Sequence, residues 1–485
     1  MLAVGCAVLV GCQSGTGGSE FASSSTTEPG AVSTTQPGNA SKTETGNIST
    51  AQPDEPTQEI GDATTTVVVP VSSTRVPRAK KPYDATLRAT LKSVASYWNT
   101  AMPSVYGKNY KQLSGGIYAY SKDSTIPPCG GIPTPYLLLQ QNAFYCPESD
   151  FIAWDDQGLF PRLNARYGPF LLSIVLAHEW GHAVQERMAL TSSSDGVTLE
   201  QQADCFAGSW SANLSVASDG ELALLRDRSL DRALAGFVEF RDLLGMTAND
   251  PGAHGTAFDR IRAFQDGYDN GAEACVDYPD QPPTLVAVPY RSFKERFRGG
   301  NLPYDQVIGT LSTRMDRFWR EQLGAIASPM LVESGGLPVC SSPLLSPEGF
   351  GETDLSWCAD DDILYYSDSD MRKVYDDVGD FGVATELALT RALAHETSTG
   401  SNIGRKNIWL RAVCTVGAWT GSMYEPDSPE LSVLSPGDVD EGVRTLLEYA
   451  TKGSQKQFGS GFEQVAAYRE GVLGSVQDCG VPVVS

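Results

Sequence analysis

Two parts of this chain have sequences that can be laid over each other, and this internal repeat constrains the fold more than any other feature. Chance could produce one matching segment, but several matches in the same order indicate a duplicated unit. The matching segments are Tyr97-Trp98 with Phe318-Trp319, Cys129 and Cys146 with Cys340 and Cys358, Leu176-Ala177-His178-Glu179 with Leu393-Ala394-His395-Glu396, Ala203–Trp210 with Ala412–Trp419, and Phe258–Cys275 with Phe462–Cys479. We therefore expect two related halves, residues 83–278 and 304–485, separated by a linker at residues 279–303 that begins with several prolines.

The cysteines follow the same division. The chain has 10 cysteines, and if Cys6 and Cys12 belong to an N-terminal signal, an even number remains in the folded part. An even number in an exported chain suggests disulfides, although spacing alone permits many pairings. If each half folds alone, its bridges should be internal and equivalent to those of the other half. The expected pairs are Cys129–Cys146, Cys205–Cys275, Cys340–Cys358 and Cys414–Cys479, and the alternative is a set of buried free thiols.

Residues 1–12 are mostly apolar and too short to span a bilayer. They resemble the end of a bacterial secretion signal, and Leu9-Val10-Gly11-Cys12 resembles a lipobox, in which Cys12 would be lipidated. No Lys or Arg precedes the apolar run, so the alternative is an apolar N-terminus with a stray cysteine. Residues 13–82 are rich in Ser, Thr, Gly and Pro and cannot bury enough apolar surface to fold, so we expect a disordered tether. Together these segments predict an exported protein held on the extracytoplasmic face of the cell membrane by a lipid anchor alone.

The charge of the chain narrows the class of partners. The formal net charge is −23. Nucleic-acid binding needs a basic face, so nucleic acid is not expected as a partner. The same charge argues against general adhesion to anionic membranes.

His178-Glu179-Trp180-Gly181-His182 is an H-E-x-x-H motif that follows an apolar run. We expect a helix over Leu171–Arg187, on which two histidines four residues apart share one face and can bind one Zn²⁺. Glu179 lies at the edge of that face, where it can deprotonate a water that zinc activates. The alternative is a buried helix that happens to carry two histidines.

A catalytic zinc usually has three protein ligands and one open position. Glu200, at the start of a second expected helix, is the candidate third ligand. Asp204 shares its helix face and would accept a hydrogen bond from the distal nitrogen of a ligand histidine, fixing its tautomer. The alternative is an exposed acidic helix face.

The second half lacks these groups. Thr399 stands at the position of the second histidine, and Trp409 and Val413 stand at the positions of the two carboxylates. Because the carboxylates and the histidine are missing together, their joint presence in the first half indicates a shared metal role. We expect one zinc ion, in the first half.

The first half resembles the bacterial neutral zinc metallopeptidases over roughly residues 85–278. The resemblance rests on Asn142–Pro147, Leu176–Gln185, Glu200–Gly208 with Trp210, and His254–Thr256 through Arg262, Phe264, Gly267 and Cys275. It implies a gluzincin-like site, with His178, His182 and Glu200 as zinc ligands and Glu179 as general base. Members usually carry a further histidine where this chain has Ala183, which is not a ligand in this scheme. The implied fold is a mainly α zincin-like domain with minor strands, in tandem with a degenerate copy.

His254 has two interpretations. It could donate a hydrogen bond to the oxyanion during peptide hydrolysis. Alternatively it is a turn residue before a helix, since Thr256 followed by Asp259 has the pattern of an N-cap with an acidic first turn. Further helical periodicity covers Leu222–Leu244 and Phe258–Tyr268.

These features favour an extracytoplasmic zinc metallopeptidase acting on protein or peptide substrates at the cell surface. The competing hypothesis is a lipid-anchored binding or assembly protein whose zinc site is structural or vestigial. A structural zinc is normally closed by a fourth protein ligand, and no further histidine lies near this motif in the sequence.

Overall fold

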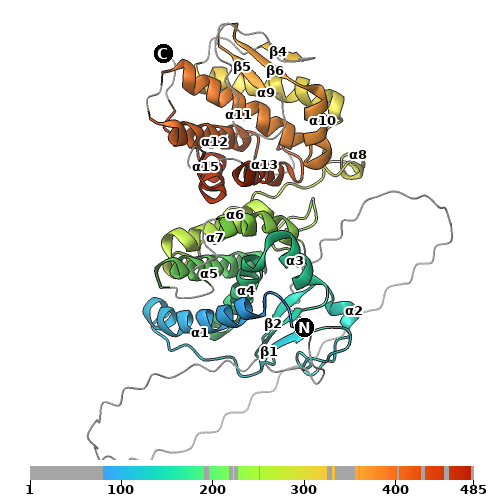
Figure 1. Ribbon diagram of the computed structural model, residues 1–485, viewed down its shortest axis with the longest axis vertical. Helices are drawn as coiled ribbons and strands as arrows, with labels where there is room; N and C mark the ends of the chain where they lie inside the picture. Colours follow the sequence, from blue (N-terminus) through green and yellow to red (C-terminus); the bar gives the residue numbers. More distant parts are fainter. Residues whose placement is uncertain are drawn as a thin grey trace, which may run out of the picture. The chain divides into compact units, whose positions relative to one another are not determined.

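Helices make up most of this computed structural model, and its strands are short (Figure 1). The structure describes residues 80–190, 196–217, 222, 228–248, 250, 252–324, 330–333, 355–359, 361–400, 403–425, 427, 432–452 and 458–481. The prediction of a mainly α fold with minor strands is confirmed. The predicted signal with Cys12, and residues 13–79 of the predicted tether, lie outside the described residues. Within the described part, none of the helices is long and apolar enough to cross a membrane.

The first half contains a three-stranded sheet. Its strands are β1 (Gly116–Tyr120), β2 (Ala143–Cys146) and β3 (Phe151–Asp155), in the order β1-β3-β2. The central strand β3 pairs parallel with β1 and antiparallel with β2. Every residue of β3 is buried, as expected for a short, nearly continuous apolar run covered on both faces. The strand β2 lies at one edge of this sheet, where it contacts helix α4.

Helix α4 (Pro169–Met188) forms the centre of the first half. It begins with proline at its first position, where the missing N–H costs nothing, and ends at Ala189 in the left-handed conformation. All of its residues from Phe170 to Gly181 are buried, so this part of the helix is surrounded by other elements on every side. The other helical elements of this half are α1 (Asp84–Tyr106), α2 (Tyr136–Leu139), α3 (Leu159–Tyr167), α5 (Gly196–Ala217), α6 (Arg228–Ala235), η3 (Gly236–Phe240), α7 (Ala257–Asn270) and η4 (Ala272–Cys275).

The helical periodicity predicted over Leu222–Leu244 is wrong beyond Phe240. The α-helical part ends at Ala235, a 3₁₀ turn follows, and residues 241–244 are not helical. The cause is tertiary. The backbone N–H of Asp242 donates to the carbonyl of Gly255, and its carboxylate accepts from the backbone N–H of His254, which together hold the segment in a loop.

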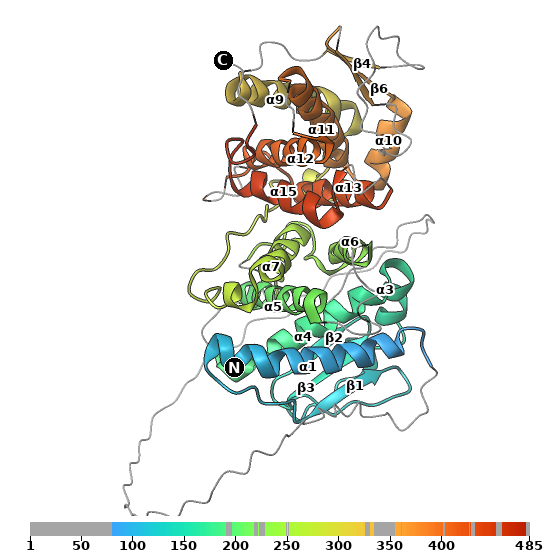
Figure 2. The ribbon, with the colours of Figure 1, turned by 60° about the vertical axis from the view of Figure 1, so that its left-hand side comes forward.

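The second half contains a sheet of the same arrangement. Strands β4 (Met330–Glu333), β5 (Ser356–Cys358) and β6 (Ile363–Tyr366) have the order β4-β6-β5, and β6 pairs parallel with β4 and antiparallel with β5. Helices α11, α12, α13 and α15 pack side by side (Figure 2). The helices from the linker onward are α8 (Phe293–Phe297), α9 (Tyr304–Leu323), α10 (Asp368–Asp377), α11 (Asp380–Ser398), α12 (Arg405–Gly421), α13 (Asp438–Lys452) and α15 (Gly461–Leu473).

Each half contains a helix pair that crosses at two glycines. In the first half, a Cβ on Gly208 of α5 would lie 1.9 Å from the carbonyl oxygen of Phe264, and one on Gly267 of α7 would lie 1.8 Å from that of Cys205. In the second half, a Cβ on Gly417 of α12 would lie 2.1 Å from the carbonyl oxygen of Tyr468, and one on Gly471 of α15 would lie 2.0 Å from that of Cys414. Backbones can approach this closely only where neither residue has a side chain.

A disulfide in each half joins the first helix of the pair to the segment that follows the second helix. Cys205 is bonded to Cys275 in the first half, and Cys414 to Cys479 in the second. Cys129–Cys146 ties β2 to the preceding loop. These three pairings are those expected from the repeat. Of the fourth expected pair, Cys358 is disulfide-bonded and Cys340 lies outside the described residues.

Candidate metal centre

Helix α4 places the two motif histidines against each other. His178 Nε2 and His182 Nε2 are 3.1 Å apart, and the two rings are perpendicular, with centroids 4.7 Å apart. One helical turn separates the two side chains, so both nitrogens point to the same side of α4.

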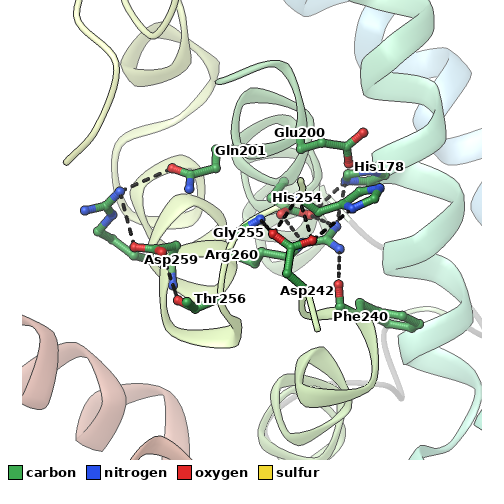
Figure 3. Close-up of polar contacts among 12 residues, drawn as sticks. His178, Glu200, Gln201, Phe240, Asp242, His254, Gly255, Thr256, Asp259 and Arg260 are labelled. Atoms are coloured by element: carbon green, nitrogen blue, oxygen red, sulfur yellow. Dashed lines mark hydrogen bonds and ion pairs between the residues drawn. The ribbon is translucent and has the colours of Figure 1, made fainter. Parts of the chain in front are cut away.

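Helix α5 brings the third group. Glu200 Oε2 lies 3.2 Å from His178 Nε2, and Glu200 Oε1 lies 3.5 Å from His182 Nε2 (Figure 3 shows Glu200 beside His178). One ligand atom from each of these three residues lies within 4.8 Å of the other two. Glu200 Oε2 is buried. It is close to the imidazole of His178, but it makes no hydrogen bond of good geometry among the described residues.

The chemistry of this donor set fits zinc. Two imidazole nitrogens and a carboxylate are the ligands of many catalytic zinc sites. Burial alone would lower the pKa of His178, but the carboxylates of Asp204 and Glu200 raise it to about 10. Burial raises the pKa of Glu200, but the nearby His182 and His254 hold it well below its usual range. The site therefore favours a positive charge between these side chains, which a divalent cation would supply.

The candidate ligand His178 contacts a buried ion pair on the side of its ring away from Glu200 and His182. Asp204 Oδ1 lies 2.8 Å from His178 Nδ1, and Arg260 of α7 binds both oxygens of Asp204, with Nε 2.7 Å from Oδ2 and Nη2 3.0 Å from Oδ1. Arg260 Nη1 also donates to the carbonyl of Phe240 (Figure 3). Burial opposes ionisation of Asp204, but Arg260 and His178 lower its pKa. An ionised Asp204 accepts from Nδ1–H, which leaves Nε2 of His178 unprotonated and available to a metal ion.

The candidate ligand His182 is held by hydrogen bonds through two glutamine side chains. Its Nδ1 lies 2.8 Å from Gln185 Oε1, and Gln185 Nε2 donates to the carbonyl of Leu199 and to Gln202 Oε1. Gln202 in turn donates to the carbonyl of Cys275. Through Gln185, the side chain of His182 is thus held in place by α5, the helix that carries Glu200.

Glu179 lies beside the candidate ligands, and one of its carboxylate oxygens makes no hydrogen bond among the described residues. This oxygen is Oε2, and the side chain is 1% exposed. Burial raises the pKa of Glu179, while the neighbouring His178, His182 and a backbone hydrogen bond from Tyr145 of β2 oppose this. A buried carboxylate of raised pKa is suited to accept and release a proton near neutral pH.

The structure places His254 in a turn before a helix, which is the second of its two interpretations. It lies in the turn before α7, where Thr256 caps the helix by accepting from the backbone N–H of Asp259. Its backbone N–H and its Nδ1 contact Asp242, at 2.8 Å and 3.2 Å respectively, and its side chain lines the same pocket as Glu200 (Figure 3 labels both residues). The turn therefore presents the imidazole to the site.

A pocket opens beside these groups. Its polar lining includes His178, Glu179, Glu200 and His254, and its apolar lining comes from Ile174 and Val175 of α4 and from Phe237 and Phe240 of η3. The pocket is small and partly open to solvent. An apolar cavity with a few convergent polar groups is the usual form of a small-ligand or side-chain subsite.

Residues 63–278 match the family model described as "Putative neutral zinc metallopeptidase". The resemblance inferred from the motifs is confirmed for this part of the chain, which contains all the site residues named above. The match covers the first half of the folded region and none of the second.

The similar proteins carry no assigned activity. An uncharacterized protein of Mycobacterium tuberculosis is 28% identical over 207 residues, which are 38% of this chain and 66% of that protein. The uncharacterized protein YpfJ of Escherichia coli is 27% identical over 191 residues, 35% of this chain and 62% of that protein. The chain thus spans just under two thirds of the length of the curated relatives it matches. No solved structure matches the chain.

Three residues that hold the site, Arg260, Asp242 and Gln185, were not predicted to do so. Arg260 and Asp242 act through contacts made only by the fold. Gln185 does have a signal, because it stands three residues after His182 on the expected helix, a spacing at which side chains meet.

Proposed function

We propose that residues 83–278 form a zinc metallopeptidase domain that hydrolyses peptide bonds, with one zinc ion held by His178, His182 and Glu200. The observation that carries this proposal is the convergence of these three side chains within 4.8 Å beside the unpaired, buried oxygen of Glu179. The family match supports the reaction class. No fourth His, Cys or carboxylate joins this cluster among the described residues, which favours a catalytic over a closed structural zinc.

Each residue has a separate chemical role. Zinc, when bound, would polarise the scissile carbonyl and make a water molecule acidic near neutral pH. Glu179 accepts the proton of the attacking water and passes it to the leaving amine. His254, held by Asp242, donates a hydrogen bond to the carbonyl oxygen as negative charge develops on it. Asp204 orients His178 through Nδ1.

We further propose that the domain acts outside the cytoplasm on protein or peptide substrates at the cell surface, anchored through a lipid on Cys12. The disulfides support an oxidising compartment, because such bonds rarely persist in the cytoplasm. In this scheme residues 1–12 are the signal, residues 13–82 the tether, and residues 279–303 a linker to the second half.

We infer that residues 304–485 are a degenerate copy of the first half. Both halves have the same sheet order, the same glycine crossing and the same disulfide at the crossing helices. Where α7 begins after the cap Thr256, α15 begins after the cap Ser460.

The metal site has been replaced by other contacts in this copy. Trp409 and Phe458 stand at the aligned positions of Glu200 and His254, and their rings pack with centroids 4.6 Å apart. Glu396, aligned with Glu179, forms an ion pair with Arg411. An aromatic contact thus takes the places of Glu200 and His254, and an ion pair engages the residue aligned with Glu179. These replacements support a structural or binding role for this half.

The test is the Glu179→Gln variant in the full chain. We expect it to bind zinc with unchanged stoichiometry and to lose cleavage of every peptide that the wild type cleaves in a peptide library. Glu186→Gln, on an exposed position of the same helix, is the matched control and should cleave like the wild type. Residual zinc-dependent cleavage by Glu179→Gln would show that another group is the base.

A further inference from the structure

The two halves of the chain contact each other through equivalent residues. The repeat aligns Phe258 with Phe462, and each is the second residue of its helix, α7 or α15. The backbone N–H of Phe258 donates to Asp440 Oδ1 at 2.9 Å, and that of Phe462 donates to Asp231 Oδ1 at 3.0 Å. Each half thus supplies an aspartate that binds the start of a helix in the other half.

The two aspartates lie in corresponding helices. Asp231 is in α6 and Asp440 in α13, and in the chain each of these helices lies between the two crossing helices of its half. Helix α6 packs against α13 and α15, and α13 packs against α7. Both aspartates are buried. Reciprocal contacts of this kind are the pattern of a twofold interface between two copies of one fold. The second half therefore occupies the place that a second copy of the first half would take.

Asp440 also makes a contact with the other end of the turn that carries His254. Its Oδ2 lies 3.1 Å from Nη1 of Arg241, in an ion pair of which the aspartate side chain is 3% exposed and the arginine side chain 22% exposed. Arg241 and Phe258 stand at the two ends of residues 241–258. One buried carboxylate of the second half thus binds both ends of this segment.

The segment leads directly to the candidate metal centre. Asp242 follows Arg241 in the chain, and its Oδ1 accepts from the backbone N–H of His254 at 2.8 Å and lies 3.2 Å from His254 Nδ1. His254 lines the pocket beside Glu179. The contact between Arg241 and Asp440 is therefore one residue away from the carboxylate that binds His254.

The segment depends on such contacts for its position. Among the described residues of 241–256 there is no helix or strand. Residues 242–246 line a cavity together with residues 435–437, 439 and 440 at the start of α13, and a Cβ on Gly437 would lie 3.1 Å from Leu244 Cδ2. A loop without a backbone ladder of its own is held by the elements that it packs against. Here one of these elements belongs to the second half.

We propose that the second half positions the turn that carries His254, with Asp440 as the positioning residue that acts through Arg241 and Phe258. The proposal rests on the proposed function, because it concerns the place of His254 during peptide hydrolysis. Asp440 contacts neither the candidate zinc ligands nor the pocket beside them. The second half can therefore serve the site of the first without any metal ligand of its own.

The test compares Asp440→Asn with Asp231→Asn in the full, zinc-loaded chain. Each variant removes one buried carboxylate from the same interface, so Asp231→Asn is the control for a general loss of packing. We expect Asp440→Asn to lower kcat about tenfold or more, as displacement of a catalytic group does, with little change in KM. Asp231→Asn should keep the wild-type kcat. Arg241→Gln removes the same ion pair from the first half and replaces Asp440→Asn if that variant does not fold.

A second comparison separates positioning from a purely structural role. In a His254→Phe background, Asp440→Asn should have no further effect on kcat, because the side chain through which it acts is already gone. A general loosening of the fold would lower kcat by the same factor in both backgrounds. That result, or an equal loss of kcat in Asp231→Asn, would overturn the proposal.

The ring signal of His254 in an NMR spectrum gives a measurement that needs no activity. The chain has 4 histidines, so selective ¹³C labelling of histidine resolves them, and loss of a signal in His254→Phe assigns it. Asp440→Asn and Arg241→Gln should shift the His254 signal, and Asp231→Asn should not. An unshifted signal in both Asp440→Asn and Arg241→Gln would refute the positioning role even if the wild type cleaves peptides. A shifted signal in a wild-type background without zinc-dependent cleavage would refute the peptidase activity and support the positioning of His254.

Discussion

Asp204 Oδ1 lies 2.8 Å from His178 Nδ1, and the same carboxylate is bound through both of its oxygens by Arg260. The contact joins a helix α4 residue to a helix α5 residue, with α7 supplying the arginine. All three side chains are buried. The orientation of one candidate zinc ligand therefore depends on how three helices pack, and not only on the H-E-x-x-H motif.

Replacing Asp204 should weaken zinc binding. In Asp204→Asn the amide can still meet His178, but it cannot hold the Nδ1 proton as a carboxylate does, and Arg260 loses its partner. We expect about 10–100-fold lower zinc affinity, the usual effect of losing a group that orients a ligand histidine. Competition with a chromogenic zinc chelator measures this. Asp269→Asn, at a partly exposed position of α7, should keep the wild-type affinity, and equal affinities for the two variants would contradict the role given to Asp204.

Replacing His254 should slow catalysis and leave zinc in place. Its ring lines the pocket with Glu179 but is not in the ligand cluster. We expect His254→Phe, which introduces the residue found at the aligned position 458, to lower kcat on the order of 10²–10³-fold. Thr256→Ala is the control, because it removes the cap of the same turn and should cost about 1 kcal/mol of stability with little change in kcat. If His254→Phe kept full kcat, His254 would be a turn residue only.

Features that depend on a short stretch of sequence, or on the repeat, could be predicted from the sequence alone. The helix carrying His178 and His182 follows from an apolar run and a fixed four-residue spacing, and the structure has it over Pro169–Met188. The disulfides could be predicted because the repeat removes most pairings. In both cases a short-range pattern or a symmetry supplies the constraint.

Other parts of the site depend on contacts that no local pattern encodes. Arg260 is 56 residues from Asp204 in the chain, and only the crossing of α5 and α7 brings them together. The helix predicted to run to Leu244 ends early because Asp242 bonds the turn at His254 instead. A long-range hydrogen bond here overrides helical periodicity.

The glycine crossings should be intolerant of any side chain. Gly208→Ala and Gly417→Ala each place a Cβ about 2 Å from a backbone carbonyl, so the helices must separate. We expect each to lower the free energy of unfolding by roughly 1–3 kcal/mol or more. Gly309→Ala, in α9 where a Cβ meets nothing within 4 Å, should instead be neutral or stabilising by about 0.5–1 kcal/mol. Denaturant unfolding at constant zinc measures all three, and tolerance of Gly417→Ala alone would show that only the first crossing is tightly packed.

Stability should also depend on pH through Glu239. Its carboxylate is contacted by Arg162 and Arg166 at 2.6 Å each and by the Tyr167 hydroxyl at 2.9 Å. Burial raises the pKa of Glu239, but these three partners outweigh burial and lower it below the usual 4.5. The folded state therefore binds this proton less readily than the unfolded state. The contribution of Glu239 is complete above pH 4.5 and is lost as the pH falls through the lower pKa of the folded state.

The variant Glu239→Gln isolates this contribution. It should be less stable than the wild type at neutral pH, because the arginines lose a charged partner, and the two proteins should converge as the pH falls through the lowered pKa of Glu239 in the folded state. Because the Arg162 and Arg166 side chains are 39% and 62% exposed, added salt will screen these ion pairs and reduce the difference in stability between the two proteins. Denaturant unfolding from pH 3 to pH 7 checks this, with the pH range chosen to span the usual glutamate pKa of about 4.3. A difference between wild type and variant that stays constant across this range would mean that the Glu239 pKa is not lowered in the folded protein.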